Sequence, residues 1–401
     1  MAERDFDSDF PFAGIRVIEL AQGVAGPGAI GMLAAYGADV VKVEDVKGDW
    51  SRRLGRTFEG ISGTFVASNR GKRSLALNLR SQDAHKILRK LATRADVLIQ
   101  NFRPGIMDRL GLDDATLKSL NPELIYISLT GFGEEGPYRG RAATDSIVQA
   151  VSGILNLNRG SDGIPHKMPI PIVDMAAALN LFQAIAIALF VREKTGCGRH
   201  LRTSLLETAA WLQAGGLAEH VATGGKLPGK LAVPRAIIPT KDNLLAVVAL
   251  EDDQFSRLCM AIGREEFAKD PRFSTADSRL ANEAELLSLL KARFTEKTAA
   301  EWAQVLAAAD VLHAPVNDYE GFLSDPQVAA SSLFAWGTQP GMGRLPLPHV
   351  VGAKPFEDGD NAMRAPALGE HSRAVLEEIG LDRDEFERLH AEGIVCIDSV
   401  S

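Results

Sequence analysis

The sequence predicts an α/β protein, the larger part of which is a doubly wound, Rossmann-like domain with a parallel sheet. Short β-branched strands alternate with helical stretches from about residue 14 to 205, as in successive βαβ units. The first strand leads through a glycine-rich segment into a second strand that ends at Glu44. The 401 residues suffice for two domains, and the contents of 46% hydrophobic and 24% charged residues are ordinary for a globular enzyme.

The elements follow in order along the chain. We expect strands near residues 14–20, 39–43, 75–79, 97–100 and 124–129, and helices near 28–36, 82–93 and 113–120. A second unit begins with a strand pair at 235–239 and 244–249, followed by amphipathic helices near 252–262, 280–294 and 298–308. The predicted organisation is therefore a large domain (1–209), a linker (210–232), a smaller α+β domain (233–325) and a return to the large domain (326–401).

The glycine-rich segment after the first strand matches a dinucleotide fingerprint. Gly26, Gly28 and Gly31 have the G-x-G-x-x-G spacing, and Glu44 ends the next strand. The match alone would indicate an NAD-dependent oxidoreductase. Pro27 stiffens the turn that must wrap a pyrophosphate, and the rest of the chain offers no constellation for hydride transfer.

Asp174 is the carboxylate around which the chain is organised. Prolines at 165, 169 and 171 favour extended backbone before it, and seventeen uncharged residues, 175–191, follow it as a helix. The pattern predicts that Asp174 is the N-cap. It either only caps the helix, or the helix dipole keeps it ionised as a nucleophile toward an acyl carbon.

Composition excludes several classes of protein. A net charge of −8 argues against nucleic acid as the main ligand, and three scattered cysteines form neither a disulfide framework nor a zinc motif. The acidic start of the chain does not look like a signal peptide, and the run 175–191 is too short and too polar for a membrane span. We therefore expect a cytoplasmic protein that binds neither nucleic acid nor membrane.

Taken together, the motifs resemble the family III CoA-transferases, which include formyl-CoA:oxalate and carnitine CoA-transferases and the related α-methylacyl-CoA racemases. The resemblance runs nearly end to end and depends on the order of many short strings. They are AGPGAIGMLAAYGADVVKVE, NRGKRSLALNL, NFRPGIMDRLGL, LTGFGEEGPY, PIVDMAA, REKTGCGRHLRTSLLETA, DPRFSTADSRLAN, HAPV, SDPQV and PALGEHS.

The resemblance implies a covalent mechanism that needs no permanently bound cofactor, with coenzyme A and acyl-CoA as substrates. The aspartate in the P-I-x-D position, here Asp174, attacks the donor thioester to form a mixed anhydride. The CoA thiolate then returns to form an aspartyl-CoA thioester, from which an acceptor carboxylate takes the CoA. Backbone amides of the glycine segment would stabilise the oxyanion.

The resemblance also implies a set of contacts to CoA. Lys72 and Arg109 would neutralise phosphates, and Phe102 would stack near the adenine. The residues matching the family's CoA contacts are Val24, Ala25, Lys72, Asn101, Phe102 and Arg109. Without the resemblance, the cations of residues 69–74 would favour a solvated turn. Asp45 stands where some members carry a CoA-contacting arginine, so that contact is absent or comes from Arg52 or Arg53.

Two residues separate the branches of the family. Racemases have a histidine just before the aspartate in the loop after GPY, but here the pair is Thr144-Asp145. Moving a proton on and off carbon needs two acid–base groups, and Thr144 cannot be one of them at neutral pH. CoA transfer is therefore favoured, and racemisation is the alternative. Asp145 is expected to shape the site or hold Thr144.

The acyl substrate and the oligomeric state are less closely defined. His166, Lys167 and Arg141 are candidates to hold a second carboxylate of a dicarboxylic acid such as succinate. A non-catalytic CoA-binding protein is the remaining hypothesis, which the intact Asp174 argues against. The family also implies an interlocked homodimer, in which one chain's large domain and the other's small domain form the active site.

Overall fold

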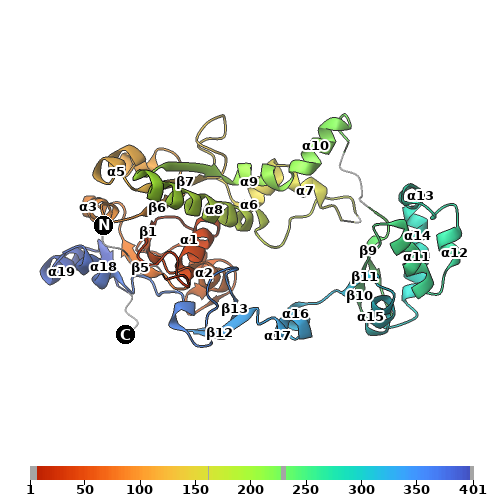
Figure 1. Ribbon diagram of the computed structural model, residues 1–401. Helices are drawn as coiled ribbons and strands as arrows, with labels where there is room; N and C mark the ends of the chain where they lie inside the picture. Colours follow the sequence, from red (N-terminus) through yellow and green to blue (C-terminus); the bar gives the residue numbers. More distant parts are fainter. Residues whose placement is uncertain (1–6, 161, 227–231, 398–401) are drawn as a thin grey trace. The chain divides into compact units, whose positions relative to one another are not determined.

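The computed structural model describes residues 7–160, 162–226 and 232–397 (Figure 1). The chain divides into two compact units. The large unit comprises Met1–Gly215 and Leu333–Ser401, and the small unit comprises Gly216–Ser332.

The large unit is built on a seven-stranded sheet in the order β14-β5-β2-β1-β6-β7-β8. All neighbours are parallel except β14, which pairs antiparallel with β5. The six parallel strands therefore have the order of a dinucleotide-binding doubly wound fold, and the predicted fold class is confirmed. The strands are β1 (Arg16–Glu19), β2 (Asp39–Glu44), β5 (Arg73–Leu77), β6 (Val97–Gln100), β7 (Ile125–Thr130), β8 (His200–Ser204) and β14 (Val395–Cys396).

Helices cover both faces of this sheet, because its strands are apolar on both sides. Val17 of β1 packs into one core with α1, α6, α8 and α9. Ile18 and Leu20 pack into the other core, with α3, α4, α5, α18 and α19. These helices are α1 (Ala25–Ala35), α3 (Gln82–Ala92), α4 (Ile106–Leu110), α5 (Asp114–Leu120), α6 (Asp145–Val151), α8 (Ile172–Thr195), α9 (Leu205–Leu212), α18 (Ser372–Glu378) and α19 (Arg383–Ala391).

Smaller elements complete the large unit. A hairpin of β12 and β13 packs with α2 into a separate apolar cluster that includes Phe65, Ala335 and Leu347. The remaining elements are a 3₁₀ helix η1 (Trp50–Arg53), β3 (Thr57–Phe58), β4 (Ile61–Ser62), α2 (Gly63–Asn69), α7 (Ile154–Leu157), β12 (Phe334–Gln339), β13 (Gly343–Pro348) and a 3₁₀ helix η2 (Asn361–Met363).

Residues 369–372 of the PALGEHS string tie the end of the chain to the sheet. The Gly369 amide donates to the Ser74 hydroxyl (2.9 Å), and the Ala76 amide donates to the Ser372 hydroxyl (3.2 Å). Ser372 in turn donates to the carbonyl of Cys396 in β14 (2.8 Å). The last part of the chain is therefore an integral part of the large unit.

The small unit is an α+β structure with its own core. Three antiparallel strands in the order β11-β10-β9 pack against helices around Phe255, Leu290 and Trp302. The elements are β9 (Arg235–Pro239), β10 (Leu244–Val248), α11 (Asp252–Ala261), α12 (Glu266–Lys269), α13 (Ala276–Ala281), α14 (Glu283–Phe294), α15 (Ala299–Ala308), β11 (Leu312–Pro315), α16 (Tyr319–Leu323) and α17 (Pro326–Ala330).

The stretch 210–232, which we expected to be a linker, is helical over much of its length. It contains the end of α9 and all of α10 (Ala214–Ala222), and the boundary between the units falls inside α10. Four glycines at 215, 216, 224 and 225 made the stretch look irregular. Residues 227–231 of this prediction lie outside the described residues.

The helix predicted near 28–36 begins earlier, at Ala25, so Gly26 lies in α1 together with Gly28 and Gly31 rather than in a turn before it. Their role is close packing. A Cβ on Gly28 would lie 3.1 Å from the Cβ of Ala178 in α8, and one on Gly31 would lie 2.8 Å from the Ser68 carbonyl oxygen in α2. The glycine of the turn itself is Gly23, which has a φ of +86°.

Helix α8 is, among the described helices, the one long and apolar enough to span a membrane by length and composition. The central helix of a folded core satisfies the same criterion. Val173, Ala177, Leu181 and Ile185 are buried in the core shared with α1, which accounts for much of this apolar character.

Candidate active site

A cavity of about 290 Å³ opens at the carboxyl ends of the parallel strands, within the large unit. It includes the segments after β1 and β6, which lie at the point where the strand order reverses, the usual position of ligand sites in open α/β sheets. Its walls are formed by Gln22, Val24, Ala25, Trp50, Asn101, Phe102, Arg103, Pro104, Leu129, Thr130, Gly131, Arg139, Arg141, Ala142, Ala143, Thr144, Asp174 and Leu205.

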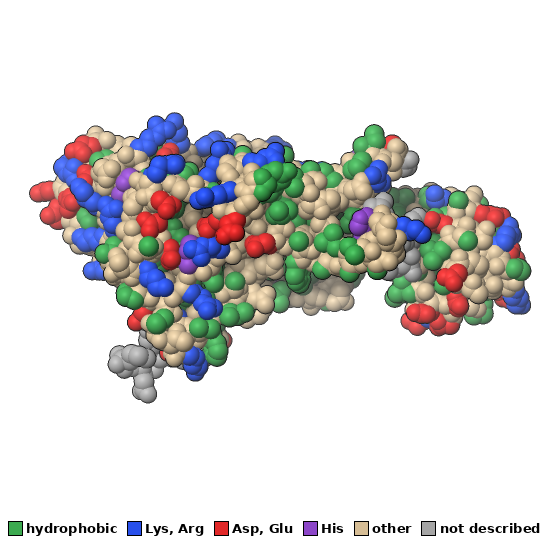
Figure 2. All heavy atoms as spheres, turned by 90° about the horizontal axis from the view of Figure 1, so that it is seen from above, with side chains coloured by type: hydrophobic (Ala, Val, Ile, Leu, Met, Phe, Trp, Pro, Cys, Tyr) green, Lys and Arg blue, Asp and Glu red, His purple; other side chains and the backbone are tan. Residues whose placement is uncertain are grey.

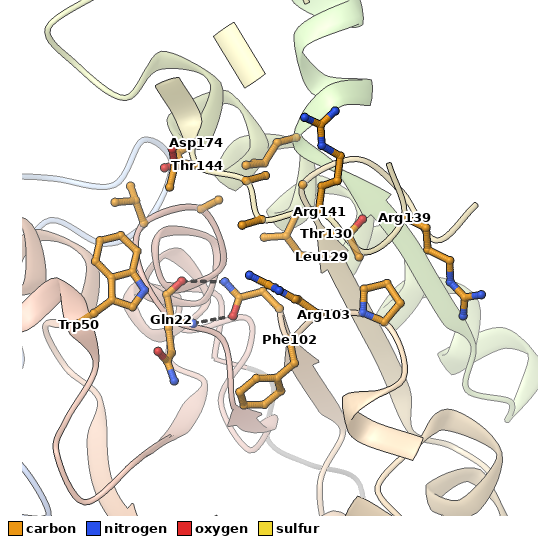
Figure 3. Close-up of a pocket in the computed structure, with 18 residues that line it drawn as sticks. Gln22, Trp50, Phe102, Arg103, Leu129, Thr130, Arg139, Arg141, Thr144 and Asp174 are labelled. Atoms are coloured by element: carbon orange, nitrogen blue, oxygen red, sulfur yellow. Dashed lines mark hydrogen bonds between the residues drawn. The ribbon is translucent and has the colours of Figure 1, made fainter. Parts of the chain in front are cut away.

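The carboxylate of Asp174 lies in this cavity beside Thr144 (Figure 3). The prediction that Asp174 caps α8 is wrong, because the N-cap is Pro171 and Asp174 is the third residue of the helix. Asp145, from α6, takes the capping role. Its Oδ2 accepts from the amides of Val173 (2.8 Å) and Asp174 (3.2 Å), and its Oδ1 accepts from the side-chain amide of Gln149 (2.5 Å).

The electrostatics around Asp174 are also opposite to the expectation from the helix dipole. Burial of the carboxyl and the neighbouring charge of Asp145 raise the pKa of Asp174 to about 7. One oxygen of Asp145, Oδ2, receives the backbone amide hydrogen bonds at the start of α8 that would have stabilised an ionised Asp174. Asp174 is therefore poised between its neutral and its anionic form near neutral pH.

Lys72 does not reach the cavity, which contradicts its predicted contact with a phosphate. Its buried Nζ donates to Glu19 Oε2 (2.8 Å), the Pro27 carbonyl (2.9 Å) and Asn69 Oδ1 (3.0 Å). All three ammonium protons are thus engaged. Burial lowers the pKa of Lys72 to about 8, although Glu19 opposes this shift.

Arg52 cannot replace the missing arginine at Asp45. It is buried, and its guanidinium forms a bidentate pair with Glu44 (2.7 and 2.6 Å) and also donates to the Pro366 carbonyl. Glu44 is the acidic residue of the apparent dinucleotide fingerprint, and this ion pair leaves it unavailable to a ribose. Arg53 is exposed and donates to the Lys47 carbonyl (2.8 Å).

The positive side chains of the cavity are Arg103, Arg139 and Arg141. The guanidinium of Arg141 lies 4.3 Å from the ring centre of Tyr138. Arg103 and Arg139 also line a second, polar cavity of about 280 Å³, which shares Phe102, Pro104 and Thr130 with the first. Phosphate groups would therefore find cations where the two cavities meet.

The other predicted site residues divide into two groups. Val24, Ala25, Asn101, Phe102, Arg141 and Thr144 line the cavity with Asp174. Asn101 exchanges two hydrogen bonds with the backbone of Gln22 (3.0 and 2.8 Å), which joins the segments after β1 and β6 (Figure 3).

Arg109, His166 and Lys167 are exposed and do not line the cavity. The His166 ring lies 3.4 Å from Asp162 on its own loop. Asp145 is buried behind the cavity wall.

Trp50, Arg103 and Arg139 are cavity residues that the sequence analysis did not select. Arg103 directly follows the NF dipeptide at the end of β6, so its position at a strand end was a usable signal. Trp50 begins the short 3₁₀ helix η1 between β2 and β3. No periodicity places its side chain in the cavity.

The chemistry available in the cavity is narrow. Asp174 is the single carboxylate among the described lining residues, and they include no histidine, cysteine or lysine. No group of acidic, histidine or cysteine residues that could hold a metal ion is found among the described residues. The arrangement suits one nucleophilic carboxylate next to cations and does not supply the two acid–base groups of a racemase.

Comparison with known proteins assigns the family. Residues 12–372 match the model of CoA-transferase family III. The chain is 35% identical to an acyl-CoA transferase of Fusarium pseudograminearum, over 95% of this chain and 88% of the relative. It is 34% identical to a succinate–glutarate CoA-transferase of Agrobacterium fabrum, over 92% of this chain and 96% of the relative.

A crystal structure of a CAIB/BAIF family protein from Brucella suis has the same fold. It superposes with a TM-score of 0.82 at 34% identity, covering 92% of this chain and 99% of that chain. The protein belongs to CoA-transferase family III. It is an enzyme that transfers CoA between an acyl-CoA and a carboxylate.

Proposed function

We propose that Asp174 is the nucleophile of this CoA transfer and carries the acyl group and then CoA as covalent intermediates. The observation that supports this is its position as the single carboxylate lining the cavity, with a pKa raised to about 7. A carboxylate of that basicity is a stronger nucleophile when ionised than an ordinary aspartate.

The proposed steps balance without an external energy source. An oxygen of Asp174 attacks the thioester carbon and the C–S bond breaks. CoA departs as its thiolate, and the acyl group remains on Asp174 as a mixed anhydride. The thiolate attacks the Asp174 carbonyl carbon of this anhydride and releases the donor acid as carboxylate. The acceptor carboxylate then attacks the carbonyl carbon of the aspartyl-CoA thioester, the C–S bond breaks to release CoA thiolate, and a second mixed anhydride forms. The thiolate attacks the acceptor's acyl carbon in this anhydride, which gives the new acyl-CoA and releases the Asp174 carboxylate.

The amino-terminal end of α1 offers a site for the oxyanion of these steps. Its N-cap Val24 makes no side-chain capping bond, and Val24 and Ala25 line the cavity. The first amides of a helix have no partner within the helix, so they are available to a developing negative charge. Pro27 contributes no amide hydrogen.

The substrates are proposed from the site and from the relatives. Arg103 and Arg139 would hold CoA phosphates, and Arg141 is the cavity residue best suited to a carboxylate of the acid. The names of the relatives include succinate, glutarate and oxalate as acids and succinyl-CoA and acetyl-CoA as donors. We propose that this enzyme acts in the cytoplasm as a homodimer.

The apolar surface of α8 supports the proposed dimer. Met175, Leu179, Ile187 and Phe190 recur on one side of this helix, and each is more than half exposed. Trp211 of α9 adds to the exposed apolar surface of the large unit. In Figure 2 charged side chains crowd the left part and the middle of the large unit, and toward its right end they thin out among hydrophobic side chains. A surface of this kind is typical of an interface.

Trapping the covalent intermediate tests the nucleophile. The protein is incubated with succinyl-CoA or acetyl-CoA, treated with hydroxylamine, digested and analysed by mass spectrometry. We expect a hydroxamate on the peptide that contains Asp174, and none in Asp174→Asn. Asp382→Asn, which alters a capping aspartate of α19, is the matched control and should retain the adduct.

The same reaction run in deuterium oxide tests the alternative. Exchange at the α-carbon of the acyl group without any hydroxamate would overturn the proposal in favour of racemisation. An adduct on a residue other than Asp174 would overturn the assignment of the nucleophile.

A further inference from the structure

Trp50 is a large aromatic residue that stands half in solvent on the cavity wall, with 46% of its surface exposed. The ring rests against Gly23, where a Cβ would lie 2.5 Å from a carbon of the indole. The absence of a side chain at Gly23 therefore lets the ring lie directly on the turn before α1. In Figure 3 the indole faces the space between Gln22 and Asp174.

A single buried carboxylate, that of Asp49, holds both the ring and the turn. The Gly23 amide donates to both oxygens of Asp49 (3.2 Å each). Asp49 also caps the 3₁₀ helix that begins with Trp50, accepting from the amide and the hydroxyl of Ser51 (2.9 Å each). The position of Trp50 relative to the turn is thereby fixed.

Lys42 neutralises Asp49 beneath the cavity. Its Nζ lies 2.9 Å from Asp49 Oδ2 and donates to the Ala21 carbonyl (3.1 Å). Burial alone would lower the pKa of Lys42, but Glu19, Asp49 and Glu44 raise it above its ordinary value. A fully buried ion pair with these additional bonds resists displacement, because separating it would leave an unpaired buried charge.

The position of Trp50 in the cavity indicates what it contacts. The turn under its ring leads directly into α1, and α1 packs through Gly28 on Ala178, one turn after Asp174 in α8. Both α1 and α8 therefore begin at the end of the cavity that Trp50 borders. Asp174, the proposed nucleophile, lies at that same end. Arg103 and Arg139 lie where the cavity meets its polar neighbour, a place that suits phosphates.

We propose that Trp50 is a specificity-determining residue, whose indole bounds the space for the acyl group and limits its size, and that Asp49 is its positioning residue. This inference rests on the proposed transferase function and deepens it. An apolar ring face next to the nucleophile favours a short acyl group that packs against it and excludes a longer one.

Acyl-chain selectivity of Trp50→Ala tests the proposal. Rates are measured with acetyl-, butyryl-, hexanoyl- and octanoyl-CoA as donors and succinate as acceptor. We expect the ratio of kcat/KM for hexanoyl-CoA to that for acetyl-CoA to rise about ten-fold, with less than a two-fold change in the dissociation constant of free CoA. Trp336→Phe alters an exposed tryptophan of β12 and is the control.

An unchanged ratio would overturn the proposal. An equal loss of kcat/KM with all four donors, accompanied by a higher dissociation constant for free CoA, would also overturn it, because Trp50 would then contact CoA. If wild type transfers CoA from no donor, the proposed function has failed. The inference is then judged by binding, where hexanoyl-CoA should gain affinity over acetyl-CoA in Trp50→Ala and not in wild type.

Asp49→Asn tests the positioning role. Asparagine keeps the shape and one acceptor for Gly23 but removes the nearer of the two carboxylates paired with Lys42, leaving Glu19 at 3.7 Å. We expect the acyl selectivity to shift in the same direction as in Trp50→Ala, and the quenching of tryptophan fluorescence by acetyl-CoA to fall. A lower melting temperature with unchanged selectivity and quenching would show that Asp49 is merely structural.

Discussion

Asp145 and Asp174 are neighbouring carboxylates with different environments and different roles. Asp145 accepts three hydrogen bonds and is buried at the start of α8, whereas no hydrogen bond to the Asp174 carboxylate is recorded among the described residues. The charge of Asp145 and burial keep the pKa of Asp174 near 7. Two neighbouring carboxyl groups in different environments, one held by hydrogen bonds and one with a raised pKa, are a common way to tune an acid–base or nucleophilic group.

Asp145→Asn should shift the pH dependence of the reaction. Removing the negative charge lowers the pKa of Asp174, so the proposed nucleophile remains ionised to lower pH and the acid limb of the kcat/KM profile moves to lower pH. The variant should also lose about 0.5–2 kcal/mol of stability, because one oxygen of the cap becomes an amide donor. Rates from pH 5.5 to 8.5 check this, with Asp382→Asn as control, and an acid limb that stays in place would contradict it.

Asp174→Asn should be more stable than wild type at alkaline pH. The pKa of Asp174 is raised from 3.8 to about 7 in the folded state, so the unfolded chain releases this proton at lower pH. The contribution of Asp174 to the free energy of unfolding is therefore fully present below pH 3.8 and is lost as the pH rises through 7. At about 1.36 kcal/mol per pKa unit the upper limit is roughly 4 kcal/mol.

Melting curves at pH 5 and pH 8.5 measure this effect. The advantage of the asparagine variant over wild type should grow with pH. Equal melting temperatures of the variant and wild type at both pH values would show that burial does not disfavour the ionised form of Asp174. A cost in stability at the proposed nucleophile is the expected form of the trade-off between activity and stability.

At the level of elements, the glycines of α1 show why a motif match can mislead. Their spacing satisfies the dinucleotide pattern, yet they lie in a helix and serve its packing on α8 and α2. The strands and most helices could be predicted, because alternation and periodicity are local properties. The function of these glycines depends on Ala178 and Ser68, which no local pattern brings next to α1.

Gly31→Ala should destabilise the protein although alanine is the better helix former. The new Cβ would lie 2.8 Å from the Ser68 carbonyl, so α1 and α2 must separate. We expect a net loss of about 1–3 kcal/mol in the free energy of unfolding, as in other overpacked cores. Gly215→Ala, in exposed α10 with no atom within 4 Å of the new Cβ, is the control and should gain up to about 1 kcal/mol.

Chemical denaturation of the two variants measures both changes. A stabilised Gly31→Ala would mean that the glycine is kept for a reason other than packing against α2.

At the level of the whole molecule, the candidate site was predicted in part. The position of Asp174 at the start of a buried helix could be read from the prolines before it and the uncharged run after it. Its cap could not, because Asp145 is 29 residues away. The prediction that Lys72 contacts a phosphate failed for a similar reason. Its partner Glu19 comes from β1, and a single sequence does not show which cations are buried.

The apolar surface of α8 leads to a prediction about assembly. Leu179 and Phe190 are 61% and 65% exposed on the same side of a helix whose opposite side is in the core. Covering this surface removes apolar area from water, so we expect sedimentation at micromolar concentration to give twice the chain mass of 43.1 kDa.

Leu179→Glu combined with Phe190→Glu should yield the monomer, because a charge on each subunit would be buried without a partner. Val351→Glu, at a 94% exposed position outside α8, should remain dimeric. A wild-type mass of 43.1 kDa, or a dimer that survives the double substitution, would show that α8 is not the contact between subunits.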